Sequence, residues 1–198
     1  MKFIIATNNP KKLVELSRIL NPLGIDAISA KEAGITLDDV EETGTTFAEN
    51  AFIKAKTAFE RTGIPAIADD SGLSVDALDG RPGIFTARYG GDGLTDEDRY
   101  LKLLDELKNV PEEKRTANFS CAICCIISDL QKIEVEGKCF GKIAFEPSKG
   151  SGFGYDPIFM YEDKCFSQLT ADEKDAVSHR GQALRKLQAE LKKLQGNT

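Results

Sequence analysis

The stretch Ile67-Ala68-Asp69-Asp70-Ser71-Gly72-Leu73 decides the fold prediction, because it places two adjacent carboxylates and a hydroxyl between apolar runs. Residues 64–68 have the pattern of a buried strand, and residues 73–78 that of a half-buried one. We therefore expect the acids at a strand end, where a mixed α/β sheet places its chemistry. Neighbouring like charges need a counter-ion, usually a divalent metal. The alternative is an Asx-type turn in which Ser71 and Gly72 make the bend.

Composition limits the classes of protein to which the chain can belong. With 198 residues, a single domain over residues 1–198 is the default, and it can bury a core without covalent staples. The net charge of -6 and the lack of a basic run argue against a nucleic-acid or membrane-surface partner. No apolar run reaches the roughly 18 residues that a membrane span requires. Residues 1–5 go directly into a strand pattern, so the expected location is cytoplasmic.

The cysteines are also consistent with a cytoplasmic location. The five of them lie mostly in apolar patterns, which suits reduced core thiols: Cys121, Cys124, Cys125, Cys139 and Cys165. A zinc or redox motif at residues 121–125 would need a second cysteine pair or a histidine at ligand spacing, and the sequence has neither.

The first strand and helix predict a site for an anion. An apolar strand at residues 2–6 leads into the loop Thr7-Asn8-Asn9-Pro10-Lys11-Lys12, and leucines at helical spacing follow. Asn9 suits an N-cap and Pro10 the first helical residue. Free amides at this helix start, together with the charges of Lys11 and Lys12, favour a negatively charged ligand. The alternative is a capped surface helix with solvated lysines.

An acidic segment precedes the second helix. After a strand at residues 25–28, Glu41 and Glu42 are followed by Thr46-Phe47-Ala48-Glu49, a capping box that opens a helix ending at Gly63. The segment is either a solvated loop or the source of a second carboxylate for a metal near Asp70. Asn50 and Lys54 lie one helical turn apart and can face the same cleft.

The middle of the chain predicts a mixed sheet. Residues 80–91 form a structured loop rich in glycine and proline, and Thr95 with Asp98 opens a helix that ends before Pro111. The stretches 116–127 and 132–140 predict an antiparallel hairpin. Strand-helix units early and a hairpin late indicate an α/β fold with a mixed β-sheet flanked by helices, compatible with two lobes and a cleft.

Two further segments carry candidate binding residues. In Gly152-Phe153-Gly154-Tyr155-Asp156 the glycines allow close approach of a ligand, Phe153 offers a stacking face and Asp156 a polar contact. A structural turn with Phe153 in the core is the alternative. His179, the only histidine, stands beside Arg180 at a helix start, although a single histidine is usually structural.

Together these parts suit a nucleoside triphosphate. Phosphoryl chemistry requires Mg²⁺, cations for the phosphates and a positioned water. The sequence has no P-loop, no dinucleotide-binding glycine motif and no nucleophile elbow around Ser71.

The motifs resemble those of the inosine triphosphate pyrophosphatase family, also called the HAM1-like family. The resemblance extends from residue 7 to residue 184 and is carried by seven segments, namely 7–12, 41–44, 47–51, 68–73, 83–89, 152–159 and 178–184. It implies an elongated mixed sheet in two lobes with a central active-site cleft, Mg²⁺ dependence and a homodimer. It also implies hydrolysis of inosine, deoxyinosine and xanthosine triphosphates between the α and β phosphates, which would remove non-canonical purines from the nucleotide pool.

The resemblance also implies roles for individual residues. Asp70 would bind the metal and accept a proton from water, and Glu41 would be the second acidic ligand. The other residues would bind substrate: Thr7, Asn8, Asn9, Pro10, Lys11 and Lys12 at the phosphates, Phe153, Gly154, Tyr155 and Asp156 at base and sugar, His179 and Arg180 at the purine 6-keto edge, and also Ser71 and Lys174. Lys11 departs from the family, which commonly has glycine there, so its role stays open, as does the choice between Glu41 and Glu42.

Two alternatives to this activity are a regulatory module that binds a nucleotide without cleaving it and a pyrophosphatase for other modified nucleotides. Several carboxylates beside an anion favour the enzyme. Donors at His179 and Arg180 suit a 6-keto acceptor and would be left unpaired by adenine.

Overall fold

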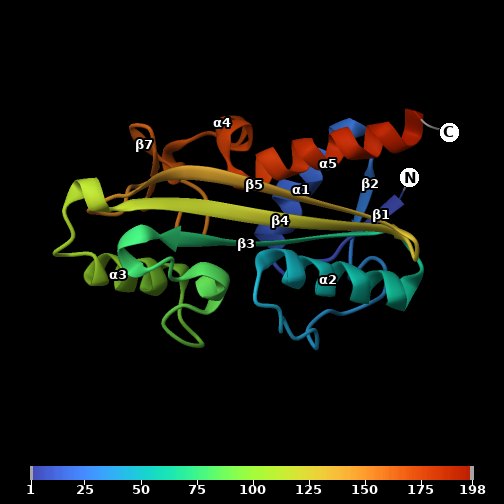
Figure 1. Cartoon of the computed structure of the whole chain (residues 1–198), viewed down its shortest axis with the longest axis horizontal. Helices are drawn as coiled ribbons and strands as arrows, with labels where there is room; N and C mark the ends of the chain where they lie inside the picture. The colour runs from blue at the N-terminus through green and yellow to red at the C-terminus, as the bar shows by residue number, and fades with distance from the viewer. Residues whose placement is uncertain (1, 197–198) are drawn as a thin grey trace. The chain divides into compact units, whose positions relative to one another are not determined.

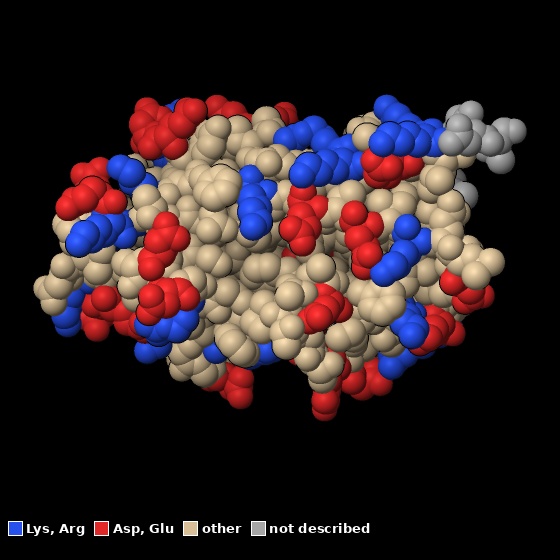
Figure 2. Space-filling view, viewed as in Figure 1, with Lys and Arg blue, Asp and Glu red and all other residues tan. Residues whose placement is uncertain are grey.

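The computed structural model describes residues 2–196 and divides into two compact units. Unit 1 contains Met1–Asp70, Cys121–Gly137 and Arg180–Thr198, and unit 2 contains Ser71–Ser120 and Lys138–His179. No helix among the described residues is both long enough and apolar enough to cross a membrane. On the face drawn in Figure 2, acidic side chains are interspersed with basic ones.

The fold is a mixed α/β fold with an open seven-stranded sheet and flanking helices, as predicted (Figure 1). The strands are hydrogen-bonded in the order β2-β1-β3-β4-β5-β6-β7. Strand β1 is parallel to β2 and β3, whereas β5, β6 and β7 pair antiparallel. The strands are β1 (Lys2–Ile5), β2 (Asp26–Ser29), β3 (Ala66–Val75), β4 (Thr116–Ser128), β5 (Gln131–Ile143), β6 (Phe159–Tyr161) and β7 (Lys164–Cys165).

The first three α-helices begin at the residues that the capping signals predict. The α-helices are α1 (Pro10–Leu20), α2 (Phe47–Thr62), α3 (Asp96–Glu106), α4 (Ala171–Val177) and α5 (His179–Gly196). Thr46 with Glu49 and Thr95 with Asp98 form the predicted capping boxes. Gly63 ends α2 with a φ of 67°, a conformation that favours glycine. Short 3₁₀ helices cover Asn21–Leu23, Asp76–Leu78, Gly83–Arg88, Glu112–Lys114 and Phe166–Gln168.

The acidic pair differs from its prediction. Ala66–Val75 is one continuous strand, so Asp69 and Asp70 lie inside β3 and neither at a strand end nor in an Asx turn. Both carboxylates are buried there, and each contacts cations from other parts of the chain. The expected strand end was wrong, and so was the alternative turn. The cations that stabilise these carboxylates away from solvent come from residues distant in the sequence, which the local pattern does not show.

Successive residues of a strand point to opposite faces of the sheet, and this alternation organises unit 1. Phe3, Ile5, Ile67 and Cys121 share one core with residues of α1 and α5. Ile4, Ala6, Ala66, Ala68 and Cys124 share another with the alanines of α2. By the same alternation, Asp69 belongs to the face with α1 and α5, and Asp70 to the face with α2.

Unit 2 has a core of its own, rich in aromatic and leucine side chains. It contains Phe119, Phe159 and Phe166, together with Leu103 and Leu107 near the C-terminal end of α3. The sequence did not predict β6, β7 or α4, because two or three strand residues and a seven-residue helix are too short for a periodic signal.

Candidate active site

Asp69 is a buried anion held by two cations. Its Oδ2 lies 3.1 Å from the Lys12 Nζ, and it accepts hydrogen bonds from the Arg180 Nε at 3.2 Å and Nη2 at 3.1 Å. Burial alone would raise the pKa of this carboxyl, but Lys12 and Arg180 hold the pKa well below its usual range. Asp69 is therefore a permanent negative charge between the first turns of α1 and α5.

Arg180 extends this group of charges to α1. Its Nη1 donates to the carboxylate of Glu15, while the rest of the guanidinium binds Asp69. Only 3% of the residue is exposed. Burial would lower the pKa of Arg180, but Asp69 and Glu15 raise it overall. Two carboxylates thus fix the direction of this guanidinium.

Asp70 faces the other side of β3 and meets residues of α2. Its Oδ2 accepts from the Asn50 amide at 3.2 Å, and its Oδ1 lies 3.2 Å from the Lys54 ammonium. Lys54 also binds Glu42 at 2.7 Å. Burial raises the pKa of Asp70, while Lys54 and Lys12 act against this shift. A carboxylate with a raised pKa is a better acceptor of protons than an exposed one.

A close backbone approach positions Asn50. Its Oδ1 accepts a hydrogen bond from the amide of Gly44 at 2.8 Å. A Cβ added at Gly44 would lie 2.6 Å from that oxygen and 2.7 Å from the Glu49 Cβ. Only glycine fits there, so Gly44 allows the acidic segment to pack on the start of α2.

The donors in unit 1 fit Mg²⁺ better than a transition metal. Mg²⁺ is commonly held by one or two carboxylates together with substrate phosphates and water. Asp70 and Glu42, joined by one ammonium, supply such oxygen donors. Among residues 2–196 no group of three histidine, cysteine or acidic side chains forms a closed metal site. Of the two alternatives from the sequence, Glu41 is exposed and Glu42 shares a cation with Asp70.

Residues 7–12, which the sequence predicts to bind phosphates, connect β1 to the first turn of α1. Asn9 is the N-cap, and its side chain accepts from the amides of Lys11 and Lys12 at 2.9 and 3.3 Å. Asn8 binds Asp38, and Pro10 is the first helical residue. The Thr7 hydroxyl accepts from the Asn9 amide at 3.2 Å. Lys11 is exposed, whereas Lys12 is partly buried beside Asp69.

In unit 2, Asp156 contacts residues of its own loop and of α4. Its Oδ2 accepts from the Phe153 amide at 2.8 Å and lies 2.7 Å from the Lys174 Nζ. The same ammonium lies over the Phe153 ring, 4.9 Å from the centroid. A Cβ at Gly152 would come within 2.3 Å of the Asp156 carboxylate. This carboxylate therefore fixes both the loop and the Lys174 side chain. The sequence motif did not indicate this role for Asp156.

The remaining predicted residues of this unit are also placed. Gly154 donates its amide to Asp96, and the buried Tyr155 donates its hydroxyl to the carbonyl of Thr86. Ser71 is half-buried in β3. His179 is the first residue of α5, is 5% exposed and stacks on Phe119 with ring centroids 4.7 Å apart.

Sequence reasoning gave no role to Phe119, and none to Asp69 beyond its place in the acidic pair. A phenylalanine in a strand carries no signal of function, whereas the one-turn spacing of Asn50 and Lys54 had indicated a shared direction. Both bind Asp70, and that indication is confirmed.

The fold and the charged residues define a class: a mixed α/β protein whose sheet carries a buried acid on each face with lysines beside them. Comparison with known proteins is more specific. The family model described as the Ham1 family matches residues 3–190. The chain therefore belongs to the Ham1 family.

Similar proteins cover nearly the whole chain. A dITP/XTP pyrophosphatase of Yersinia pseudotuberculosis serotype I is 48% identical over 188 residues, covering 93% of this chain and 94% of that one. The dITP/XTP pyrophosphatase of Bacillus subtilis is 48% identical over 186 residues, 93% of each chain. The structure of a HAM1 protein from Coxiella burnetii matches with a TM-score of 0.87 at 41% identity, covering 98% and 99% of the two chains. The Staphylococcus aureus Ham1 protein gives a TM-score of 0.85 at 40% identity, covering 97% and 98%.

Proposed function

We propose that this chain is a nucleoside triphosphate pyrophosphatase that hydrolyses ITP, dITP and XTP between the α and β phosphates. The products are the monophosphate and pyrophosphate, and the reaction removes non-canonical purines from the nucleotide pool. Relatives named dITP/XTP pyrophosphatase, 48% identical over almost the full length, support the reaction and the substrates. The structural observation that carries the proposal is the single ammonium of Lys54, which lies 3.2 Å from Asp70 and 2.7 Å from Glu42.

The proposed general base is Asp70. Attack on a phosphate requires a water that loses a proton, and a carboxylate with a raised pKa accepts that proton more readily. Asn50 holds one oxygen of Asp70 and Lys54 contacts the other, so the direction of the carboxylate is fixed. Mg²⁺ bound by Asp70 and either Glu41 or Glu42 would neutralise the charge of the phosphates.

The proposed phosphate contacts lie in residues 7–12. Lys12 and Asn9 are the principal ones, because the helix start presents amides and Lys12 adds a full charge. Asp69 limits the positions that the Lys12 ammonium can adopt. Ser71 and Lys174 are proposed as further substrate contacts.

Base recognition is assigned to residues 153–156, His179 and Arg180. The donors of His179 and Arg180 match the 6-keto group of hypoxanthine and xanthine, and the 6-amino group of adenine would leave those donors unpaired. The contacts within the loop modify the proposed role of Asp156. Its carboxylate binds the Phe153 amide and the Lys174 ammonium, so Asp156 acts on the base through these two residues.

A homodimer in the cytoplasm, without a nucleic-acid or membrane partner, completes the proposal. The family resemblance supports the dimer. The negative net charge, and the acidic and basic side chains interspersed on the face drawn in Figure 2, suit a protein without a nucleic-acid partner. Light scattering of the purified chain measures the oligomeric state directly.

One assay tests the reaction and separates it from the two alternatives. Pyrophosphate release is measured for ITP, dITP, XTP, GTP, ATP and a panel of modified pyrimidine triphosphates, each with Mg²⁺ and with a chelator. The proposal expects Mg²⁺-dependent release that is fastest for the 6-keto purines other than GTP. Nucleotide binding without release would favour a regulatory module. Preference for a modified pyrimidine would change the substrate class.

A further inference from the structure

His179 is held against an aromatic ring. Its imidazole stacks on Phe119 of β4, with centroids 4.7 Å apart and an interplanar angle of 11°. His179 is 5% exposed and Phe119 is 7% exposed. Both residues belong to unit 2, so this contact is internal to one compact unit.

Phe119 is itself fixed by other rings. Phe159 lies 4.7 Å away at 58°, and Phe166 lies 5.9 Å away at 7°. Phe159 and Phe166 contact each other edge to face at 4.8 Å. Offset and edge-to-face pairs of this kind are favourable beyond their buried area. The Phe119 ring thus forms part of a rigid cluster and not of a mobile surface.

The parallel Phe119 ring fixes the orientation of the imidazole plane, which a histidine side chain does not fix by itself. The terminal torsion of a histidine side chain is broad, so an isolated imidazole can rotate over a wide range. Hydrogen bonds weaken steeply when donor and acceptor are misaligned. The nitrogens of an imidazole point outward in the plane of the ring. Stacking therefore directs them parallel to the Phe119 face.

We propose that Phe119 is a specificity-determining positioning residue, which fixes the plane of the His179 ring so that its in-plane nitrogen meets the 6-keto edge of the purine. This inference rests on the proposed function of His179. Phe119 acts through the histidine and touches neither the phosphates nor the reacting atoms.

The first measurement does not depend on activity. Because the chain has a single histidine, its ring protons give isolated NMR signals in histidine-labelled protein. Protons above an aromatic face are shielded, so Phe119→Leu is expected to move the His179 Cε1 proton signal downfield. Phe119→Met, which keeps volume without a ring, should move it in the same direction.

The second measurement is the ratio of ITP to ATP hydrolysis. Loosening one hydrogen-bonding group should lower this ratio by about 3- to 10-fold in both Phe119 variants. His179→Ala should lower it at least as much. Phe159→Leu is the matched control. It removes a ring of the same cluster that lies as close to Phe119 as His179 does, with centroids 4.7 Å apart in both pairs. It should lower thermal stability while changing the ratio less than twofold.

Each outcome decides the inference. A downfield signal with a reduced ratio in the Phe119 variants, but not in Phe159→Leu, supports it. An unmoved signal overturns it, and so does an unchanged ratio when His179→Ala loses discrimination. An unchanged ratio in His179→Ala overturns base recognition by His179 and this inference with it. Wild-type pyrophosphate release from ITP is tested separately, so a failure of the proposed reaction remains distinguishable.

Discussion

Each unit buries an arginine, and the two are compensated in opposite ways. Arg180 in unit 1 binds the carboxylates of Asp69 and Glu15. Arg115 in unit 2 is 1% exposed and donates to main-chain carbonyls of Leu107, Val110, Ile143 and Ala144. Burial lowers the pKa of Arg115, whereas the carboxylates raise that of Arg180.

The difference shows what each unit is built to hold. In unit 2, main-chain carbonyls hold the Arg115 guanidinium between the turn after α3 and the end of β5. Arg115 therefore acts as a structural cross-link. Carboxylates create a chain of charges from Glu15 through Arg180 and Asp69 to Lys12, with Asp70 on the opposite face of the strand. Unit 1 thus holds the charged candidates for chemistry, and unit 2 holds the aromatic candidates for base recognition.

The largest expected effect tests whether the chemistry belongs to unit 1. Asp70→Asn should keep its fold and bind nucleotide, but turnover of ITP should fall by about 10³-fold, because the proton acceptor and one metal charge are lost. Steady-state pyrophosphate release and a thermal melt measure both properties.

The matched change in unit 2 is His179→Ala. It should keep turnover of ITP within about tenfold of wild type while it loses discrimination. Near wild-type hydrolysis by Asp70→Asn would remove Asp70 from the chemistry and undo the division between the units.

The two buried arginines should contribute unequally to stability. Arg180→Met should lower the free energy of unfolding by about 4 kcal/mol, because it leaves Asp69 and Glu15 without their guanidinium. Arg115→Met should cost less, about 3 kcal/mol, since it strands neutral carbonyls. Urea unfolding of the two variants gives both values.

A double variant isolates the contribution of the ion pair between Asp69 and Arg180. Adding Asp69→Asn to Arg180→Met removes a stranded charge and should recover part of the loss. If the double variant is less stable by the full sum of the single effects, the carboxylate was not stabilised by Arg180.

A smaller effect is expected at the phosphate loop. Lys12→Ala should raise the KM for ITP by about 10- to 100-fold through the loss of a charged contact. Lys11→Ala is the control, because Lys11 is the neighbouring residue on the same helical turn but is exposed. Equal effects of the two substitutions on KM would mean that general charge, and not the position beside Asp69, attracts the phosphates.

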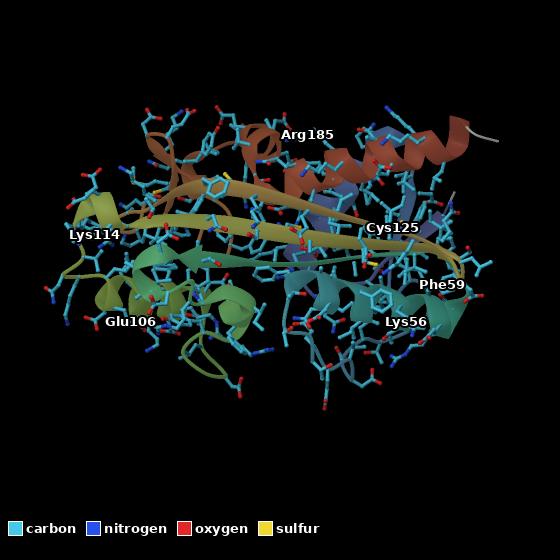
Figure 3. All side chains as sticks on the ribbon, viewed as in Figure 1. Lys56, Phe59, Glu106, Lys114, Cys125 and Arg185 are labelled. Carbon is cyan, nitrogen blue, oxygen red and sulfur yellow. The ribbon has the colours of Figure 1, made fainter. Side chains whose placement is uncertain are left out.

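The smallest effect per residue is expected at alkaline pH, and it concerns thiols of both units. Burial raises the pKa of Cys121, Cys124 and Cys125 to about 12, and that of Cys139 to about 11. Figure 3 labels Cys125, which lies on β4. The ordinary thiol value is 9.0, so the unfolded chain loses these protons first. The contribution of these protonated thiols to the free energy of unfolding should be fully present below pH 9. It should fall by about 1 kcal/mol per thiol near pH 10.

Denaturant titrations at pH 8 and pH 10 measure this loss. Cys125→Ala should reduce the difference between the two pH values, because one buried thiol is removed. The same loss in the variant as in wild type would assign the alkaline effect to other groups.

The sequence predicted local features well because their causes are local. Asn9 caps α1, the capping box at Thr46 opens α2, and residues 116–140 lie in two neighbouring strands, as the patterns indicated. In each of these cases the decisive residues lie within a few positions of one another.

The path of β3 through the acids was not predictable by the same means. Asp69 is stable inside a strand only because Lys12 and Arg180 reach it, and Arg180 is 111 residues away in the sequence. The partners of Phe119 are likewise 40 residues or more away. Such contacts depend on how the elements pack, which a pattern of neighbouring residues does not record.

The order in which the ribosome makes the segments of unit 1 determines when this unit can fold. A ribosome makes Asp69 long before Arg180, and Leu184, Leu187 and Leu191 of α5 complete the core around β1 and α1 only at the end. Proteins generally fold from the N-terminus during translation. Here the first seventy residues must wait for the last helix, while unit 2, whose final segment ends at His179, has its whole sequence first. We therefore expect the N-terminal part of the nascent chain to be the last to reach its native state.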